Sequence, residues 1–295
     1  TSEVKKAHKK HHKSSLALDR HPMSTRMSYA AVHVAIMSTW NDYSTRQNIR
    51  KSWLTFTGNW SHSFIIGKSS NAHDDLYKLN TEISTYGDIV SGNFVDSYYN
   101  LTRKAVVMLS LENRAEYIFK ADTDSYVNIP HLLRYISMKR STPIQYAGRI
   151  VKSLKPDRDE KGRWHVSKAS WPHDNTPFPD FAQGQGYLVK SSLARCMMGV
   201  VALEWPDYRL EFPLEDVFIG ILADKCRVYP RHMVSLAQYV KYAALLGSNS
   251  GGRGIRTKRS NNSNSNSKPI ITHKEWVYAH RKTDGEILVK LLEGK

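Results

Sequence analysis

The feature of the sequence that most constrains the fold is a regular alternation of short apolar runs with amphipathic segments in its first half. Runs rich in Val, Ile, Phe and Tyr predict strands, and apolar side chains at helical spacing predict helices. The predicted strands are 29–38, 61–67, 116–121 and 144–150, and the predicted helices are 44–56, 73–87, 98–114 and 130–139. This alternation indicates an α/β fold with an open, mostly parallel sheet flanked by helices on both faces.

Local signals place the ends of these helices. Ser44 or Thr45 is a suitable N-cap for the first helix, and Gly87 is a suitable end for the second. Pro130 stands where the first residue of the fourth helix belongs. The segments that follow the strands therefore lie at one edge of the sheet, where open α/β sheets bind their ligands.

The chain after Val151 has a different character. It is richer in Gly, Pro and aromatic residues, which predicts long loops, and two further helices are expected at 193–204 and 213–225. Residues 1–27 form a basic tail and 247–268 a low-complexity insertion, and we expect both to be disordered.

The formal net charge of +16 could indicate a partner that is anionic, such as nucleic acid, a membrane surface or a small anion. Much of this charge lies in the tail and the insertion rather than on one ordered face with interleaved aromatic residues. We therefore expect no nucleic-acid partner. A basic module that binds nucleic acid or anionic glycans remains an alternative interpretation.

The sequence gives weak signals for a secretory compartment. It has no run of roughly 18 uninterrupted apolar residues that could span a bilayer. Because the chain begins at Thr1, we expect a leader or membrane anchor N-terminal to it. Cys196 and Cys226 allow at most one disulfide within the chain, and their pairing is left open. Three acceptor sequons for N-glycosylation begin at Asn59, Asn100 and Asn261.

Two acidic residues follow the strand predicted at 116–121. Asp122 and Asp124 lie on the same side of an extended backbone, so both can face one cation. Carboxylate oxygens suit Mg²⁺ or Mn²⁺, which take further ligands from water and from substrate phosphates. The alternative is that the two acids cap the following turn through side-chain hydrogen bonds.

Three other pairs are candidates for the same site. Arg46 and Arg50 share one helix face, where they could hold a diphosphate, or could simply be solvated. Gly184 and Gly186 allow a backbone to approach a ligand closely, or could form an ordinary turn. The third pair, Glu215 and Asp216, precedes a helical apolar face, where acids also complement the helix dipole, and Gly220 there allows tight packing.

Five sequence blocks, in the same order, resemble the β1,3-glycosyltransferases of glycosyltransferase family 31. The resemblance runs from about Tyr29 to about Leu236, with a weaker similarity near His273. The blocks are RQNIRKSW at 46–53, YGDIVSGNFVDSYYNLTRK at 86–104, FKADTDSYVN at 119–128, FPDFAQGQGYLVKSSLA at 178–194 and LEDVFIG at 214–220.

The resemblance implies a GT-A fold in one continuous domain over 28–295, with a nucleotide-sugar-binding half at 28–150 and an acceptor-binding half at 151–295. Family members are inverting, Mn²⁺-dependent Golgi enzymes of type II membrane topology. They transfer galactose or N-acetylglucosamine from UDP-galactose or UDP-N-acetylglucosamine to a glycan acceptor on a glycoprotein or glycolipid. The sequence does not distinguish the two donor sugars.

The same resemblance assigns roles to individual residues. It implies metal ligands at Asp122, Asp124 and His273, the last of which could equally be structural. Asp122 and Lys120 would face the nucleotide sugar. Asp216 is expected to be the catalytic base, with Glu215 as the second candidate.

Two departures from the family pattern bear on these roles. The middle acid of the family's acidic motif is Thr123 here, which removes one charge and keeps the two metal-facing positions. The insertion at 247–268 precedes His273 and makes its alignment ambiguous.

The alternative enzyme class is a metal-dependent nucleotidyl or phosphoryl transferase, which also uses paired acids and a divalent ion. Such an enzyme favours phosphate-binding glycine loops, and the sequence contains no G-x-x-x-x-G-K-(S/T) motif. The sequence therefore favours sugar transfer over phosphoryl transfer.

Overall fold

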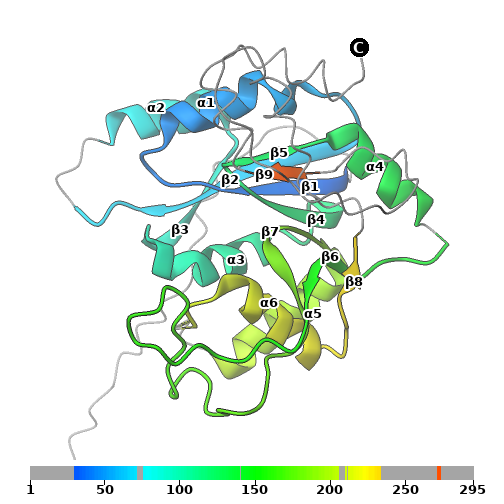
Figure 1. Ribbon diagram of the computed structural model, residues 1–295. Helices are drawn as coiled ribbons and strands as arrows, with labels where there is room; N and C mark the ends of the chain where they lie inside the picture. Colours follow the sequence, from blue (N-terminus) through cyan, green and yellow to red (C-terminus); the bar gives the residue numbers. More distant parts are fainter. Residues whose placement is uncertain are drawn as a thin grey trace, which may run out of the picture.

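The computed structural model describes residues 30–71, 76–139, 141–205, 210 and 212–233, and the backbone of 271–273 (Figure 1). The predicted tail at 1–27 and the predicted insertion at 247–268 lie outside the described residues. In the described part of the chain, no helix combines the length and the apolar character needed to cross a bilayer.

A seven-stranded sheet forms the centre of the molecule, in the order β3-β2-β1-β4-β7-β6-β8. Strands β1 to β4 run parallel, whereas β7 is antiparallel to both of its neighbours, β4 and β6. This confirms the mostly parallel α/β sheet. The strands are β1 Ala30–Met37, β2 Trp60–Lys68, β3 Ile89–Val95, β4 Ala115–Asp122, β6 Tyr146–Val151, β7 Phe181–Lys190 and β8 Arg231–His232.

A second, small sheet pairs β5 (Ser125–Val127) with β9 (Ile271–His273) in antiparallel fashion. It brings residues that are far apart in the sequence side by side, because Ser125 is the register partner of His273. The backbone of His273 therefore lies next to the segment that carries Asp124.

Helices cover both faces of the large sheet, as predicted (Figure 1). Helices α3, α5 and α6 pack together on one face and share a hydrophobic core with it. Helices α1 and α4 contribute to a separate core on the other face. The helices are α1 Tyr43–Lys51, α2 Tyr77–Tyr86, α3 Leu101–Leu109, α4 Ile129–Met138, α5 Ser191–Glu204 and α6 Glu215–Lys225, with short 3-10 helices η1 Trp53–Thr55 and η2 Tyr98–Asn100.

The two-residue period of β4 determines where its polar side chains point. Tyr117 and Phe119 belong to the core beneath α1 and α4, whereas Ile118 belongs to the core beneath α3, α5 and α6. Because successive side chains of a strand alternate between faces, Lys120 and Asp122 lie on the same side as Ile118. Both are thereby directed toward the face that α6 covers.

The strand order reverses between β1 and β4. The chain leaves β1 for β2 on one side of β1, and β4 lies on its other side. Met37, the last residue of β1, is the register partner of Asp122, the last residue of β4. Ligands of open α/β sheets bind beyond such a reversal.

Some predicted boundaries are confirmed and others are wrong. The helices predicted at 44–56 and 98–114 end earlier, at Lys51 and Leu109. Gly87 ends α2 with a φ of 63°, and Pro130 lies in the first turn of α4. The N-cap of α1 is neither Ser44 nor Thr45 but Asp42, whose side chain accepts a hydrogen bond from the backbone N–H of Thr45. An Asp carboxylate is as good a cap as a Ser or Thr hydroxyl, so composition alone did not choose between them.

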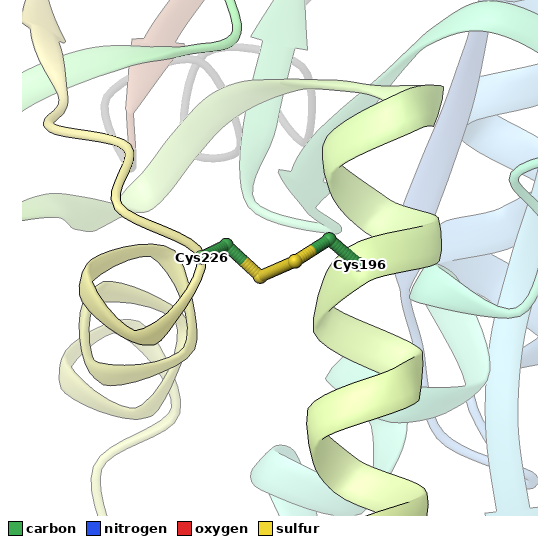
Figure 2. The surroundings of a disulfide bond; sticks show 2 residues. All are labelled: Cys196 and Cys226. Atoms are coloured by element: carbon green, nitrogen blue, oxygen red, sulfur yellow. A yellow bond between two sulfur atoms is a disulfide. The ribbon is translucent and has the colours of Figure 1, made fainter.

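Cys196 and Cys226 form a disulfide, which settles the pairing that the sequence left open. Figure 2 shows that it joins α5 to the chain at the end of α6. Gly220 in α6 packs against β7 so closely that an added Cβ would lie 2.5 Å from Cβ of Phe181. The tight packing predicted for Gly220 is therefore confirmed.

Candidate active site

A cavity of about 580 Å³ lies beyond the carboxyl ends of β1 and β4. Its walls come from the segments after β1 and β4, from η2 and α3, from the middle of β7 and from the first residues of α6. The structure thus brings together residues from both sides of residue 150. The predicted site residues that line it are Lys120, Asp122, Asp124, Gly184, Glu215 and Asp216.

Lys120 is the buried cation at the centre of this group. Its Nζ lies 2.6 Å from Oδ1 of Asp122 and 3.6 Å from Oε2 of Glu215, and it also donates to the carbonyl oxygen of Gly184. Burial alone would lower the pKa of Lys120, but the charges of Asp122 and Glu215 outweigh it and raise the pKa. Lys120 therefore stays protonated and fixes the side chain of Asp122.

Glu215 is almost fully buried behind Lys120. Its Oε1 accepts a hydrogen bond from the hydroxyl of Tyr187, a residue of β7. Burial raises the pKa of Glu215 to about 7, and the positive charge of Lys120 limits the rise. With one oxygen bonded to Tyr187 and the other beside Lys120, Glu215 is oriented by the protein on both sides.

Asp216 is more exposed to the cavity than Glu215 is. The backbone N–H of Gly184 donates to its Oδ2 at 2.9 Å, and the N–H of Val217 donates to its Oδ1 at 2.9 Å. Burial raises the pKa of Asp216, and these hydrogen bonds oppose the rise. The arrangement holds an ionisable group with raised basicity at a fixed position in the cavity wall.

Gly184 lines the cavity and holds two of its charged side chains through its backbone. Its N–H contacts Asp216 and its carbonyl contacts Lys120, so one residue connects both groups. A Cβ at this position would lie 3.4 Å from Oδ2 of Asp216 and 3.5 Å from Oε2 of Glu215. Gly186 lies two residues further along β7 and pairs with Ala121, and it is absent from the described residues that line the cavity.

A second ion pair in the cavity wall escaped prediction. Lys104 of α3 lies 2.5 Å from Oδ1 of Asp96 and also donates to the carbonyl oxygen of Ser38. Oδ2 of Asp96 accepts hydrogen bonds from the backbone N–H groups of Trp40 and Gly67. This ion pair ties the ends of β1, β2 and α3 together. Both residues fall within the block at 86–104, so the signal was present in the sequence.

Arg46 and Arg50 lie elsewhere than expected. Arg46 is fully buried and forms a two-point ion pair with Glu82, while Arg50 binds Glu82 and, at two points, Asp88. Neither arginine is among the described residues that line the cavity. Because their guanidinium groups already bind carboxylates and other groups of the protein, the geometry gives no support to the expectation that they hold a diphosphate.

Arg46 instead shapes the cavity from behind. Its Nη1 donates to Oγ of Ser38 at 3.1 Å and to the carbonyl oxygen of Thr39. Both Ser38 and Thr39 line the cavity. The arginine thus orients the segment that leaves β1.

The acidic side chains at the strand ends suit a divalent cation that takes some of its ligands from the protein and the rest from a substrate. Among the described side chains there is no group of three or more His, Cys, Asp or Glu residues arranged to hold a metal. Asp122 ends β4, whereas Asp124 lies in the turn that follows and not on extended backbone as predicted. Both carboxylates line the cavity, and carboxylate oxygen is the ligand type that Mg²⁺ and Mn²⁺ prefer. The backbone of His273 runs beside Ser125, and its side chain lies outside what the structure describes.

The charge of the cavity also favours a bound cation. Five carboxylates but only three cationic side chains line it, counted over the described residues. An anionic diphosphate would be repelled by this excess unless a cation accompanied it. The carboxylates are Asp96, Asp122, Asp124, Glu215 and Asp216, and the cations are Lys104, Lys120 and Arg163.

Known proteins resemble this chain over about three fifths to two thirds of its length. Beta-1,3-galactosyltransferase 4 of Mus musculus is 31% identical over 209 residues, which cover 61% of this chain and 54% of the relative. Beta-1,3-galactosyltransferase 5 of Pan paniscus is 26% identical over 200 residues, covering 65% of this chain and 64% of the relative. The chain thus spans little more than half the length of the first of these relatives.

A solved structure, the apo form of the bifunctional glycosyltransferase WbbM, aligns with a TM-score of 0.39 and 11% identity. The alignment covers 84% of this chain and 46% of the WbbM chain. A family model described as Galactosyltransferase matches residues 44–234, well over half of the chain. The sheet, the cavity at its strand ends and this match agree with the relationship that the five sequence blocks predicted: the chain belongs to the galactosyltransferase family.

Proposed function

We propose that the protein is an inverting β1,3-galactosyltransferase that uses UDP-galactose, requires Mn²⁺ or Mg²⁺ and acts on a glycan acceptor. The observation that carries the proposal is the shared cavity. It is lined both by Asp122 and Asp124, which follow β4, and by Asp216 of α6. One set of carboxylates can thus serve the diphosphate while a separate one serves the acceptor.

Asp216 is the proposed catalytic base. Inversion requires an acceptor hydroxyl to attack the anomeric carbon from the face opposite UDP while a carboxylate removes its proton. The backbone N–H groups of Gly184 and Val217 hold both oxygens of Asp216 in a fixed orientation, and burial raises its pKa. A higher pKa makes the carboxylate a stronger proton acceptor.

Glu215 takes a supporting role in this proposal. Its oxygens face the Tyr187 hydroxyl and the Lys120 ammonium group, so they are occupied from within the protein. Glu215 helps to hold Lys120, and Lys120 in turn orients Asp122 and the carbonyl of Gly184. The contacts favour Asp216 over Glu215 as the base.

Asp122 and Asp124 would hold the cation, with His273 as a further candidate ligand. A bound divalent ion would supply positive charge that offsets the negative charge developing on the departing diphosphate. Lys120 keeps Asp122 directed into the cavity, where 32% of that side chain is exposed. The raised pKa of Lys120 maintains this orientation over the physiological pH range.

A UDP-sugar panel tests the proposal. UDP-galactose, UDP-N-acetylglucosamine, UDP-glucose and UDP-N-acetylgalactosamine are incubated with the protein and Mn²⁺, Mg²⁺ or EDTA, and the released UDP is measured with and without acceptor glycans. We expect metal-dependent turnover of UDP-galactose. Preference for UDP-N-acetylglucosamine would correct the donor, and label transferred from the β-phosphate instead of the sugar would support a phosphoryl transferase.

We further propose that the protein works in the lumen of the Golgi, as the family resemblance implies. The disulfide between Cys196 and Cys226 supports an oxidising compartment. Fractionation of cells that produce the protein, followed by non-reducing electrophoresis of the Golgi fraction, tests this assignment. Recovery in the cytosolic fraction with free thiols would contradict it.

A further inference from the structure

A second cavity, of about 540 Å³, adjoins the first. Tyr98, Arg163 and Pro213 line both cavities and therefore form the boundary between them. Asp216 lies only three residues from Pro213 and lines the first cavity near this boundary. A molecule that presents a hydroxyl to Asp216 can thus extend past the boundary into the second cavity.

The second cavity is lined by aromatic and hydrogen-bonding side chains. Tyr99 is 77% exposed and Tyr98 is 45% exposed, which is unusual for large aromatic residues that lie side by side. Their rings meet edge to face at 6.1 Å, and the guanidinium group of Arg163 lies 5.5 Å from the ring of Tyr98. Ser167 and Ser170, from the segment that follows β6, supply hydroxyl groups.

The segment 157–171, which supplies most of the residues lining the second cavity, is held by its own hydrogen bonds. The side chain of Asp157 accepts from the N–H of Asp159, and the carbonyl of Asp159 accepts from the N–H of Gly162 at 2.8 Å. Arg158 donates to the carbonyl oxygens of Val166 and Trp171 at 2.6 and 2.7 Å. This segment is therefore organised before any ligand arrives, which reduces the entropy that binding must overcome.

We propose that the second cavity binds the inner sugar of the acceptor, so that the enzyme selects glycans of two or more sugars over single sugars. This inference rests on the proposed function of the first cavity. The C–H face of a pyranose packs against an aromatic ring, and its hydroxyl groups pair with polar side chains such as Arg163 and Ser167. Exposed tyrosines beside such groups have the mixed character that this ligand needs, and the volume suits a small ligand.

The position of Tyr98 and Tyr99 also bears on the division of the chain into halves. Both residues belong to η2 and precede residue 150, yet they line the proposed acceptor subsite. The proposed acceptor subsite therefore includes part of 28–150, the half that the family resemblance assigned to the nucleotide sugar.

Tyr99→Ala tests the inference, with Tyr229→Ala as the matched control. Tyr229 is 72% exposed, and it is not among the described residues that line either cavity. The substrates are p-nitrophenyl glycosides of galactose, N-acetylglucosamine and N-acetylgalactosamine, compared with lactose, N-acetyllactosamine and chitobiose. We expect Tyr99→Ala to raise the acceptor KM about fivefold for the disaccharides, to leave the KM of the single sugars unchanged, and to leave hydrolysis of UDP-galactose unchanged.

The possible failures are distinguishable. If Tyr99→Ala still hydrolyses UDP-galactose and has the same acceptor KM for disaccharides as the wild type, the proposed subsite is wrong while the proposed function stands. If the wild type neither hydrolyses nor transfers any UDP-sugar, both are wrong. If hydrolysis occurs without transfer, a glycan array probed with UDP and Mn²⁺ decides: binding by the wild type that Tyr99→Ala loses supports the subsite, and equal binding or no binding overturns it.

Discussion

The backbone N–H of Gly184 donates a 2.9 Å hydrogen bond to Oδ2 of Asp216, and this contact joins the middle of β7 to the first turn of α6. The carbonyl of the same glycine accepts from Lys120. A single residue thus positions both the proposed base and the cation that orients the strand-end acids. The proposed base Asp216 and the proposed metal ligand Asp122 are therefore both positioned through the backbone of Gly184.

Replacing Asp216 separates chemistry from binding. We expect Asp216→Asn to reduce transfer by about 10²- to 10⁴-fold, because an amide cannot accept the hydroxyl proton. UDP affinity should change less than threefold by calorimetry, which corresponds to less than about 0.7 kcal/mol. Loss of UDP affinity in parallel with transfer would count against the role of Asp216 as base.

Replacing Lys120 tests the buried ion pairs. We expect Lys120→Met to lower the free energy of unfolding by about 3 kcal/mol, because Asp122 and Glu215 lose their shared partner in a buried setting. Lys225→Met is the control: its Nζ pairs with Glu204 at the surface, and removing it should cost less than about 1 kcal/mol. Urea unfolding at pH 7.5 measures both, and equal effects would contradict the account.

His33 makes stability depend on pH. Burial, with smaller contributions from the charges of Arg114 and His62, lowers its pKa to about 3 from an unfolded value of 6.5. The unfolded chain therefore binds more protons between these pH values, so stability is fully present above pH 6.5 and falls as the pH drops toward 3. Between pH 6.5 and 5 the loss should be roughly 2 kcal/mol.

His33→Gln isolates this contribution, since glutamine does not titrate and can still bond to Oγ of Ser61, the partner of the histidine Nδ1 at 2.8 Å. Urea unfolding at a series of pH values compares the two proteins. We expect the variant to have a shallower slope below pH 6.5. Identical slopes would show that His33 does not remain neutral in the folded state.

The disulfide is expected to stabilise the fold without serving the chemistry. It closes a separation of 30 residues between Cys196 and Cys226, so Cys196→Ser should lower the free energy of unfolding by about 3.5 kcal/mol. Dithiothreitol should have a similar effect on the wild type and none on the variant. A change of donor KM in the folded variant would be evidence that the disulfide also shapes the cavity.

Sequence patterns predicted the parts of the fold in which local and long-range preferences agree. The apolar runs gave β1, β2, β4 and β6, and helical spacing gave the main helices. Five strands of the described chain were not predicted: the short β5, β8 and β9, and the longer β3 and β7. β3 contains Gly92, and β7 contains the QGQG stretch with Gly184 and Gly186, so both lack the continuous apolar character that marks a buried strand.

Residues of the candidate site could be predicted where the ionisable side chains lie within one short sequence motif. Asp122 and Asp124 stand at the end of a recognisable strand, and Glu215 and Asp216 at the start of a recognisable helix. Arg46 and Arg50 could not be placed in the same way, because their partner Glu82 lies 36 and 32 residues further along the chain. A spacing of four residues shows that two side chains share a face and does not show what faces them.

Binding of Mn²⁺ in the presence of UDP tests the central claim most directly. Calorimetric titration of Mn²⁺ into the UDP-bound protein should show one site in the wild type, and Asp124→Ala should weaken it at least tenfold while circular dichroism and the unfolding transition stay unchanged. The account predicts that UDP-galactose turnover is lost together with this site. Equal Mn²⁺ affinity and equal turnover in wild type and Asp124→Ala would contradict it.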